Sequence, residues 1–222
     1  MIINYSENTG KQNMDYDLQL LENSIEKQIT EPILRFYGWN PSCISLGRNQ
    51  KDEFLDNEFV NKNNIDVVRR ITGGRALFHD NEVTYCFVCP VEFLNNGDHV
   101  ISSYKEISQF LIDGMADLGI KLDYGQKKST KNAQDYCMML STGADLCYED
   151  KKLIGSAQCR KKGYILQHGS ILYDYDKNIL EKIFSNKNIT QNIVSVKQIN
   201  PTIKKEDLIN AFKHNALKSF KM

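Results

Sequence analysis

The chain has 222 residues, of which 41% are hydrophobic, and this is enough for one domain with a sizeable core. Its 28 basic and 28 acidic residues balance, so no overall charge favours nucleic acid or a membrane surface. Because there is no signal-peptide pattern and no run of eighteen apolar residues, we expect a cytoplasmic, monomeric protein that forms a single domain over residues 1–222. Its six cysteines should then stay reduced.

Apolar spacing along the chain predicts helices inserted between strands. Leu18, Leu21 and Ile25 recur at helical spacing and predict an amphipathic helix. The predicted helices span residues 15–29, 53–64, 103–118, 179–184 and 207–220. The predicted strands lie in residues 33–39, 41–47, 67–90 and 151–174. This order predicts an α+β fold with a mixed, mostly antiparallel sheet and helices packed against it.

Residues 67–90 read as a strand, a tight loop and a second strand. Gly73 and Gly74 form the loop, where positive φ is possible and backbone N–H groups can approach a ligand. Side chains that donate hydrogen bonds surround the two glycines: Arg69, Arg70, Thr72, Arg75 and His79. This pattern favours an anionic or carbonyl-bearing ligand, and the alternative is an ordinary hairpin with solvated arginines.

Residues 151–174 are predicted to form a β-hairpin that turns near Gly163. Lys152 opens its first strand, and the small residues Gly155 and Ala157 share one face, which leaves room for a ligand. His168 and Gly169 lie on the return strand. The alternatives are an edge lysine whose ammonium reaches water and a hydrogen-bonded core histidine beside a bulge glycine.

Cys86 and Cys89 spell CxxC within the strand expected before Pro90. Residues three apart on a strand point to opposite faces, and the sequence holds no second pair to complete a tetrahedral site. We therefore expect no metal.

Taken together, RRITGGRALFH, the ExTY step at 82–85 and KKLIGSAQCRKKGYILQHGSIL resemble the catalytic domain shared by lipoate-protein ligases, octanoyltransferases and biotin-protein ligases. The motif GSAQxRxxGxxLQHGSIL is most similar to that of the cysteine/lysine octanoyltransferases of lipoate assembly. PSCISLGRNQ and Met14-Asp15 extend the resemblance, which runs from Met14 to Phe184. It implies the same α+β fold.

The resemblance also implies site residues. In the octanoyltransferase branch a nucleophilic cysteine precedes the lysine of the KxxGSAQ strand, which implies Cys137 and Lys152 as the catalytic pair. The sequence CMMLSTGADL departs from that branch, which usually has a Pro-Ser step and Tyr-Glu-Leu after the cysteine, and Cys137 on a core strand is the alternative. The residues implied to bind substrate are Arg70, Thr72, Gly73, Gly74, Arg75, Ala76, His79, Gly155, Ser156, Ala157, His168 and Gly169.

A free thiol with a pKa near 8.5 is only about 3% ionised at pH 7, and lowering that pKa by two units costs about 2.7 kcal/mol. One ammonium at about 4 Å supplies on the order of 4 kcal/mol at intermediate dielectric. Lys152 is therefore sufficient to activate Cys137 without a catalytic histidine.

The activity implied is that of an octanoyl-[acyl-carrier-protein]:protein N-octanoyltransferase, an acyltransferase that needs neither ATP nor a metal. Its partners would be octanoyl-acyl carrier protein and a lipoyl-domain or glycine-cleavage H-type acceptor. Both are commonly acidic, and two basic groups form a candidate docking rim: Lys127, Lys128 and Lys131, with Arg160, Lys161 and Lys162. Solvated loop charges are the alternative.

Three other functions use the same scaffold. An ATP-dependent lipoate-protein ligase would need ATP and magnesium, and would grip an adenylate with Lys152 and the loop around Gly73. An amidotransferase between lipoyl-bearing proteins would use the same cysteine and lysine, and a non-catalytic protein would only bind the carrier. About fifty residues follow the QHG strand, too few for a second substantial core, which favours a transferase.

Overall fold

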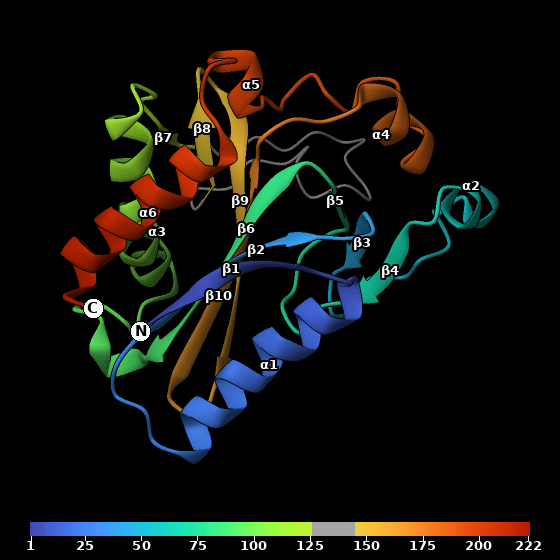
Figure 1. Cartoon of the computed structure of the whole chain (residues 1–222). Coiled ribbons are helices and arrows are strands. Elements are labelled where there is room, and N and C mark those ends of the chain that lie inside the picture. The colour runs from blue at the N-terminus through green and yellow to red at the C-terminus, as the bar shows by residue number, and fades with distance from the viewer. Residues whose placement is uncertain (126–144) are drawn as a thin grey trace.

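A computed structural model describes residues 1–125 and 145–222 and contains two β-sheets flanked by helices (Figure 1). The larger sheet has seven strands in the order β1-β2-β6-β10-β9-β8-β7. These strands are β1 (Ile2–Asn8), β2 (Ile33–Trp39), β6 (Glu82–Pro90), β7 (Asp123–Tyr124), β8 (Leu146–Tyr148), β9 (Lys151–Lys161) and β10 (Tyr164–Leu172). Neighbours are antiparallel except β1, which is parallel to β2. The predicted α+β fold with a mostly antiparallel sheet is confirmed.

The smaller sheet adds a short strand to the strand, loop and strand that were expected in residues 67–90. It contains β3 (Cys43–Leu46), β4 (Asp66–Arg69) and β5 (Leu77–His79) in the order β4-β3-β5. Strand β4 is parallel to β3 and β5 is antiparallel to it. Strands β4 and β5 are therefore not paired with each other and do not form a hairpin. The loop with Gly73 and Gly74 crosses from one edge of this sheet to the other.

The predicted β-hairpin of residues 151–174 is present. Strands β9 and β10 pair without interruption from Ile154 opposite Ile171 to Lys161 opposite Tyr164. Lys162 and Gly163 make the turn with φ angles of 48° and 79°, as the two central residues of a type I′ turn require. This long hairpin places KKLIGSAQ directly beside LQHGSIL.

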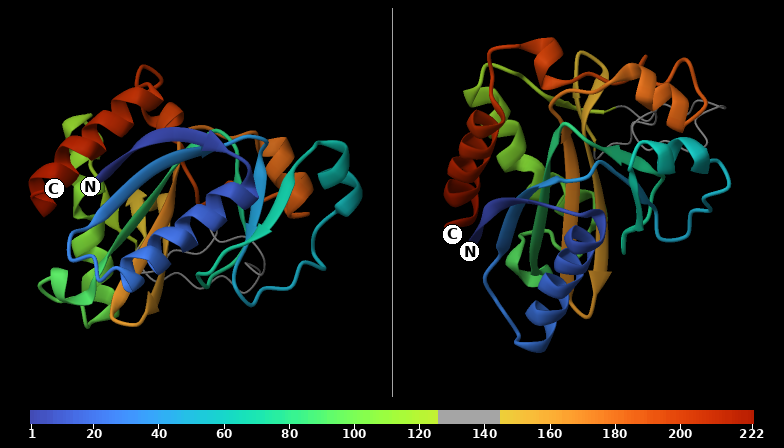
Figure 2. Two further views of the ribbon diagram at one scale, coloured as in Figure 1. Left: turned by 60° about the horizontal axis from the view of Figure 1, so that its bottom comes forward. Right: turned by 45° about the vertical axis from the view of Figure 1, so that its right-hand side comes forward.

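Helices cover both faces of the larger sheet (Figures 1 and 2). They are α1 (Gly10–Glu26), α2 (Asn57–Lys62), the 3-10 helix η1 (Val91–Phe93), α3 (Val100–Asp117), α4 (Lys177–Ile183), α5 (Val196–Ile199) and α6 (Lys205–Phe220). One hydrophobic cluster joins the sheet to α1 through Leu21, and a larger one joins it to α3 and α6 through Phe110 and Phe212. Among the described residues, no helix combines the length and the apolar character needed to cross a bilayer.

The strand β6 is buried on both faces, and its alternation divides the core. Cys86 belongs to the cluster under α1, whereas Phe87 and Cys89 belong to the cluster under α3 and α6. The two cysteines of the CxxC step thus face opposite sides of the sheet, as the sequence predicted.

Candidate active site

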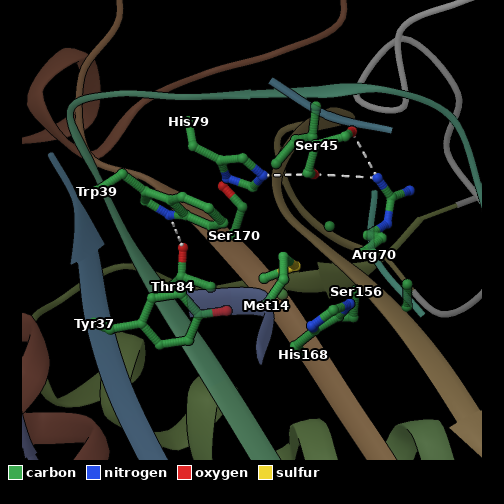
Figure 3. Close-up of a pocket in the computed structure, with 14 residues that line it drawn as sticks. Met14, Tyr37, Trp39, Ser45, Arg70, His79, Thr84, Ser156, His168 and Ser170 are labelled. Atoms are coloured by element: carbon green, nitrogen blue, oxygen red, sulfur yellow. Dashed lines mark hydrogen bonds between the residues drawn. The ribbon is translucent and has the colours of Figure 1, made fainter. Parts of the chain in front are cut away.

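A narrow cavity, which we call the slot, lies between α1, the larger sheet and the smaller sheet (Figure 3). The two motif-bearing segments meet there, because β9 and β10 form one wall and β5 with the loop before it forms another. The residues that line the slot are Met14, Tyr37, Trp39, Ser45, Arg70, Leu77, His79, Thr84, Gly155, Ser156, Ala157, His168, Gly169 and Ser170.

Asp17 on α1 organises one side of the slot. Its buried carboxylate accepts hydrogen bonds from Arg35 at 2.9 Å, from the Tyr37 hydroxyl at 2.8 Å and from His168 Nδ1 at 3.0 Å. With Nδ1–H donating to Asp17, a neutral imidazole accepts at Nε2 from the Thr72 hydroxyl, which lies at 2.7 Å. The chain of contacts ties α1, β10 and the glycine loop together.

Glu82 organises the opposite side in the same manner. This buried carboxylate accepts hydrogen bonds from His79 Nδ1 at 2.8 Å, from Thr84 and from Ser170. Burial alone would raise the pKa of Glu82, but the charge of His79 and these three hydrogen bonds hold it below its usual value. Trp39 stacks on His79 with ring centroids 4.0 Å apart and donates from Nε1 to Thr84 at 2.7 Å, so the aromatic wall is fixed (Figure 3).

The polar side chains around the slot are turned toward protein partners. Each of the following makes at least one hydrogen bond within the protein: Tyr37, Trp39, Ser45, Arg70, His79, Thr84, Ser156, His168 and Ser170. Each of these side chains thus has a partner within the protein, and the surface left to a guest is mostly carbon. Such a slot suits an apolar chain better than a charged or sugar-like one.

Two glycines allow the strands and the loop to pack this closely. A Cβ at Gly169 would lie 2.6 Å from Tyr85 and 2.7 Å from the Gly155 carbonyl oxygen. Gly74 has φ +100°, a conformation that side-chain-bearing residues rarely adopt. Arg70 holds the same loop by donating to the carbonyl oxygens of Gly73 at 3.0 Å and Arg75 at 2.7 Å. Arg70 therefore shapes the loop as well as lining the slot.

Lys152 lies at the start of β9, three residues before Gly155 of the slot. Its Nζ is 3.0 Å from Oδ1 of Asp145, and both side chains are buried, at 3% and 4% exposed. Lys152 itself is not one of the residues that line the slot. The proposed nucleophile, Cys137, lies outside the described residues, and Asp145 is a partner that sequence reasoning did not identify.

Of the twelve residues expected to bind substrate, the structure brings seven together at the slot. These are Arg70, His79, Gly155, Ser156, Ala157, His168 and Gly169. Thr72 does not line the slot but is hydrogen-bonded to His168, which does. Ala76 is buried. The other three lie on the loop and outside the slot lining: Gly73, Gly74 and Arg75. Sequence reasoning did not assign seven lining residues to the site: Met14, Tyr37, Trp39, Ser45, Leu77, Thr84 and Ser170. Leu77, Thr84 and Ser170 nevertheless fall within its motifs, and Met14 and Ser45 fall within the segments that extend the resemblance.

Three cysteines described by the structure are poorly suited to nucleophilic attack. Burial raises the pKa of Cys43 and Cys86 well above the usual value, and it raises the pKa of Cys89 to about 12. Within residues 1–125 and 145–222, no group of three or more His, Cys, Asp or Glu side chains is arranged to hold a metal ion.

The family model described as the lipoyl protein ligase A/B catalytic domain matches residues 9–221. The octanoyltransferase LipM of Clostridioides difficile is 38% identical over 182 residues, which cover 80% of this chain and 67% of that protein. The octanoyltransferase LipM of Bacillus subtilis is 40% identical over 181 residues, which cover 78% of this chain and 64% of that protein. The matched region thus spans about two thirds of these relatives.

Solved structures show the same fold at lower identity. LipL1 of P. falciparum in complex with lipoate superposes with a TM-score of 0.78 and 24% identity, covering 100% of this chain and 62% of that one. An archaeal lipoate protein ligase from Thermoplasma acidophilum gives a TM-score of 0.73 and 20% identity, covering 100% and 84%.

Proposed function

The chain belongs to the lipoyl protein ligase A/B catalytic-domain family, and from this premise we propose that it is an octanoyltransferase of lipoate biosynthesis. Relatives at 35%, 38% and 40% identity carry that name. The structural observation that carries the proposal is the slot, whose polar side chains are hydrogen-bonded within the protein and which leaves carbon surface to its guest. A saturated acyl chain is the guest that such a surface suits.

The proposed reaction has two transfers. The Cys137 thiolate attacks the carbonyl carbon of an octanoyl thioester on acyl carrier protein, and the carrier thiolate leaves and takes up a proton. The uncharged amine of an acceptor lysine then attacks the new thioester, and Cys137 leaves as a thiolate while the amine loses a proton. An amide replaces a thioester, so the second transfer is favourable, and the route uses neither ATP nor a metal.

Lys152 has the role of favouring the thiolate of Cys137. The ammonium lies on the strand that continues into the slot, and a positive charge near sulfur lowers the pKa of a thiol. Asp145 shares that charge, so the thiolate competes with a carboxylate for Lys152. Backbone N–H groups near Gly73 and Gly155 are the proposed donors to the oxyanion of each tetrahedral intermediate.

The proposed acceptor is a lipoyl domain or a glycine-cleavage H-type protein, and the proposed donor is octanoyl-acyl carrier protein. The test combines the purified protein with both partners in the absence of ATP and follows the acceptor by mass spectrometry. We expect octanoylation of the acceptor and, when the acceptor is omitted, an octanoyl adduct on Cys137. Cys137→Ala should abolish both, whereas Cys89→Ala, which removes a buried thiol on the face of the sheet under α3 and α6, should change neither.

Other outcomes would assign a different function. Transfer that requires free lipoate or octanoate with ATP and magnesium, and that survives Cys137→Ala, identifies a ligase. Transfer from an octanoylated H-type protein but not from the acyl carrier identifies an amidotransferase. Binding of the carrier with no turnover from any donor identifies a carrier-binding protein.

A further inference from the structure

A second concave surface adjoins the slot. This groove of about 570 Å³ lies between α1, the ends of β3 and β4, and the end of β9, and we call it the basic groove. Arg70 lines both the slot and the basic groove, so the two adjoin at this side chain. Neither the proposed chemistry nor the twelve expected substrate-binding residues account for it, apart from Arg70.

The basic groove has a positive charge that the protein does not neutralise. Arg48 is exposed and makes no side-chain hydrogen bond or ion pair with any residue of the described part of the chain. Arg69 donates to two carbonyl oxygens, of Gly47 at 2.9 Å and of Gln50 at 2.6 Å, which leaves its positive charge without a carboxylate. No Asp or Glu is among the described residues that line the groove.

The basic side chains at the end of β9 point to two different faces of the sheet, so they do not form one docking rim. Lys161 reaches the α1 side, where it forms an exposed ion pair with Glu22 at 3.0 Å. Arg160 points to the opposite side and donates to the Gly97 carbonyl oxygen and the Ser103 hydroxyl, each at 2.6 Å. Arg160 therefore adds no free guanidinium to the groove, and Lys127, Lys128 and Lys131 lie outside the described residues.

The floor of the basic groove is apolar. It is formed by Leu18 and Leu21 of α1, by Ile71 and by Cys159. Cations above an apolar floor complement a partner that carries carboxylates beside apolar side chains, as an acidic amphipathic helix does. A free anion would use the arginines but would leave the floor uncovered.

We propose that the basic groove docks an acidic amphipathic helix of the protein that delivers the octanoyl thioester. This inference rests on the proposed transferase function. Cys159 is seven residues from Lys152 along β9, a distance of about 23 Å at 3.3 Å per residue. A carrier presents its thioester on a long flexible arm that spans such a distance, whereas an acceptor presents a single lysine side chain that does not. The groove is thus a donor site.

The test reverses charge in the groove with Arg48→Glu combined with Lys161→Glu. Arg69 is left intact because its hydrogen bonds hold backbone carbonyls. The matched control, Lys213→Glu with Lys218→Glu on α6, makes the same change in net charge far from the groove. Each protein is assayed with octanoyl-acyl carrier protein and with the small thioester octanoyl-N-acetylcysteamine, and binding of the carrier is measured by fluorescence anisotropy.

We expect the groove variant to raise KM for the octanoylated carrier, and Kd for the carrier, by at least tenfold at low salt. Its kcat, its rate with the small thioester and its KM for the acceptor should match those of the wild type and of the control. An unchanged carrier Kd, an equal loss with the small thioester, or a rise in the acceptor KM alone would each overturn the inference. If the wild type transfers from neither thioester, the proposed transferase function is wrong. The anisotropy measurement then tests independently whether the carrier binds in the groove.

Discussion

The Lys152 ammonium and the Asp145 carboxylate lie 3.0 Å apart, and each side chain is at least 96% buried. A charge in such a position is costly unless it is paired, and removing one partner of a buried pair typically costs 3–5 kcal/mol, which sets the order of magnitude here at about 4 kcal/mol. The pair therefore keeps a cation on the strand that leads into the slot. It also means that a thiolate near Lys152 shares the cation with a carboxylate.

The substitution Asp145→Asn should separate these two effects. With the carboxylate gone, the charge of Lys152 is no longer shared with Asp145 and can stabilise the Cys137 thiolate more strongly, so alkylation of Cys137 by iodoacetamide should reach half its maximal rate at lower pH. The melting temperature should fall, because the buried ion pair with Asp145 is lost. Peptide mapping of the alkylated protein identifies the thiol. An unchanged alkylation profile in a folded variant would show that Lys152 does not act on Cys137.

The substitution Lys152→Met tests the proposed interaction between Lys152 and Cys137 by removing the ammonium. Loss of the ammonium removes about 2.7 kcal/mol of thiolate stabilisation if the thiol pKa had been lowered by two units, which lowers the thiolate fraction at pH 7 from about 75% to about 3%, or about 25-fold. We expect kcat to fall by at least this factor and alkylation to require higher pH. The variant Lys152→Met with Asp145→Asn removes both charges, so it should recover stability and not activity. Full activity in either variant would contradict the proposed role of Lys152.

Much of the architecture was predictable because local patterns carry it. The hairpin of β9 and β10 was recognisable from two apolar runs around Lys162-Gly163, and β2 begins and ends where its apolar run does. Helix α1 begins at Gly10, earlier than expected, because Thr9 caps it in a capping box with Gln12. Strand β1 and helix α5 were missed, since IINYSEN has little alternation and VKQI is only one turn long.

The candidate site was predictable only where the motifs lie. His79 and His168 stood out in the sequence, but the carboxylates that hold them did not, because Asp17 is 151 residues from His168 along the chain. Glu82 was visible in the ExTY step, yet its hydrogen bond to Ser170 depends on the pairing of β6 with β10. Contacts between distant segments are set by tertiary packing, and a single sequence contains no direct signal for them.

Met14 offers a way to change the acyl preference without disturbing the hydrogen-bonded walls. It reaches the slot from α1, and its thioether is not part of the hydrogen bonds that fix the neighbouring residues (Figure 3). Met14→Ala should widen the slot and raise the rate with decanoyl and dodecanoyl thioesters, relative to octanoyl, by about tenfold, which corresponds to about 1.4 kcal/mol. Competition between thioesters of different length, read by mass spectrometry of the acceptor, measures the ratio.

The matched control for that experiment is Met115→Ala, which truncates a buried methionine of α3 on the opposite face of the sheet. It should lower stability and leave the chain-length ratio unchanged. If both variants shift the ratio equally, or if Met14→Ala leaves it unchanged, the slot does not hold the acyl chain.

Glu82 should make the stability of the fold sensitive to acid. Its pKa is lowered in the folded state, so its contribution to the free energy of unfolding is fully present above the unfolded value near 4.5 and is lost as pH falls through the folded value. Glu82→Gln removes this titration and should lower the free energy of unfolding by about 3 kcal/mol at pH 7, because charge-assisted hydrogen bonds are lost. Urea unfolding is measured from pH 7 to pH 3. The difference in the free energy of unfolding between wild type and Glu82→Gln should become smaller below about pH 4.5. The exposed Glu26→Gln should follow the wild type, and a difference that is the same at pH 7 and pH 3 would mean that Glu82 is not ionised in the fold.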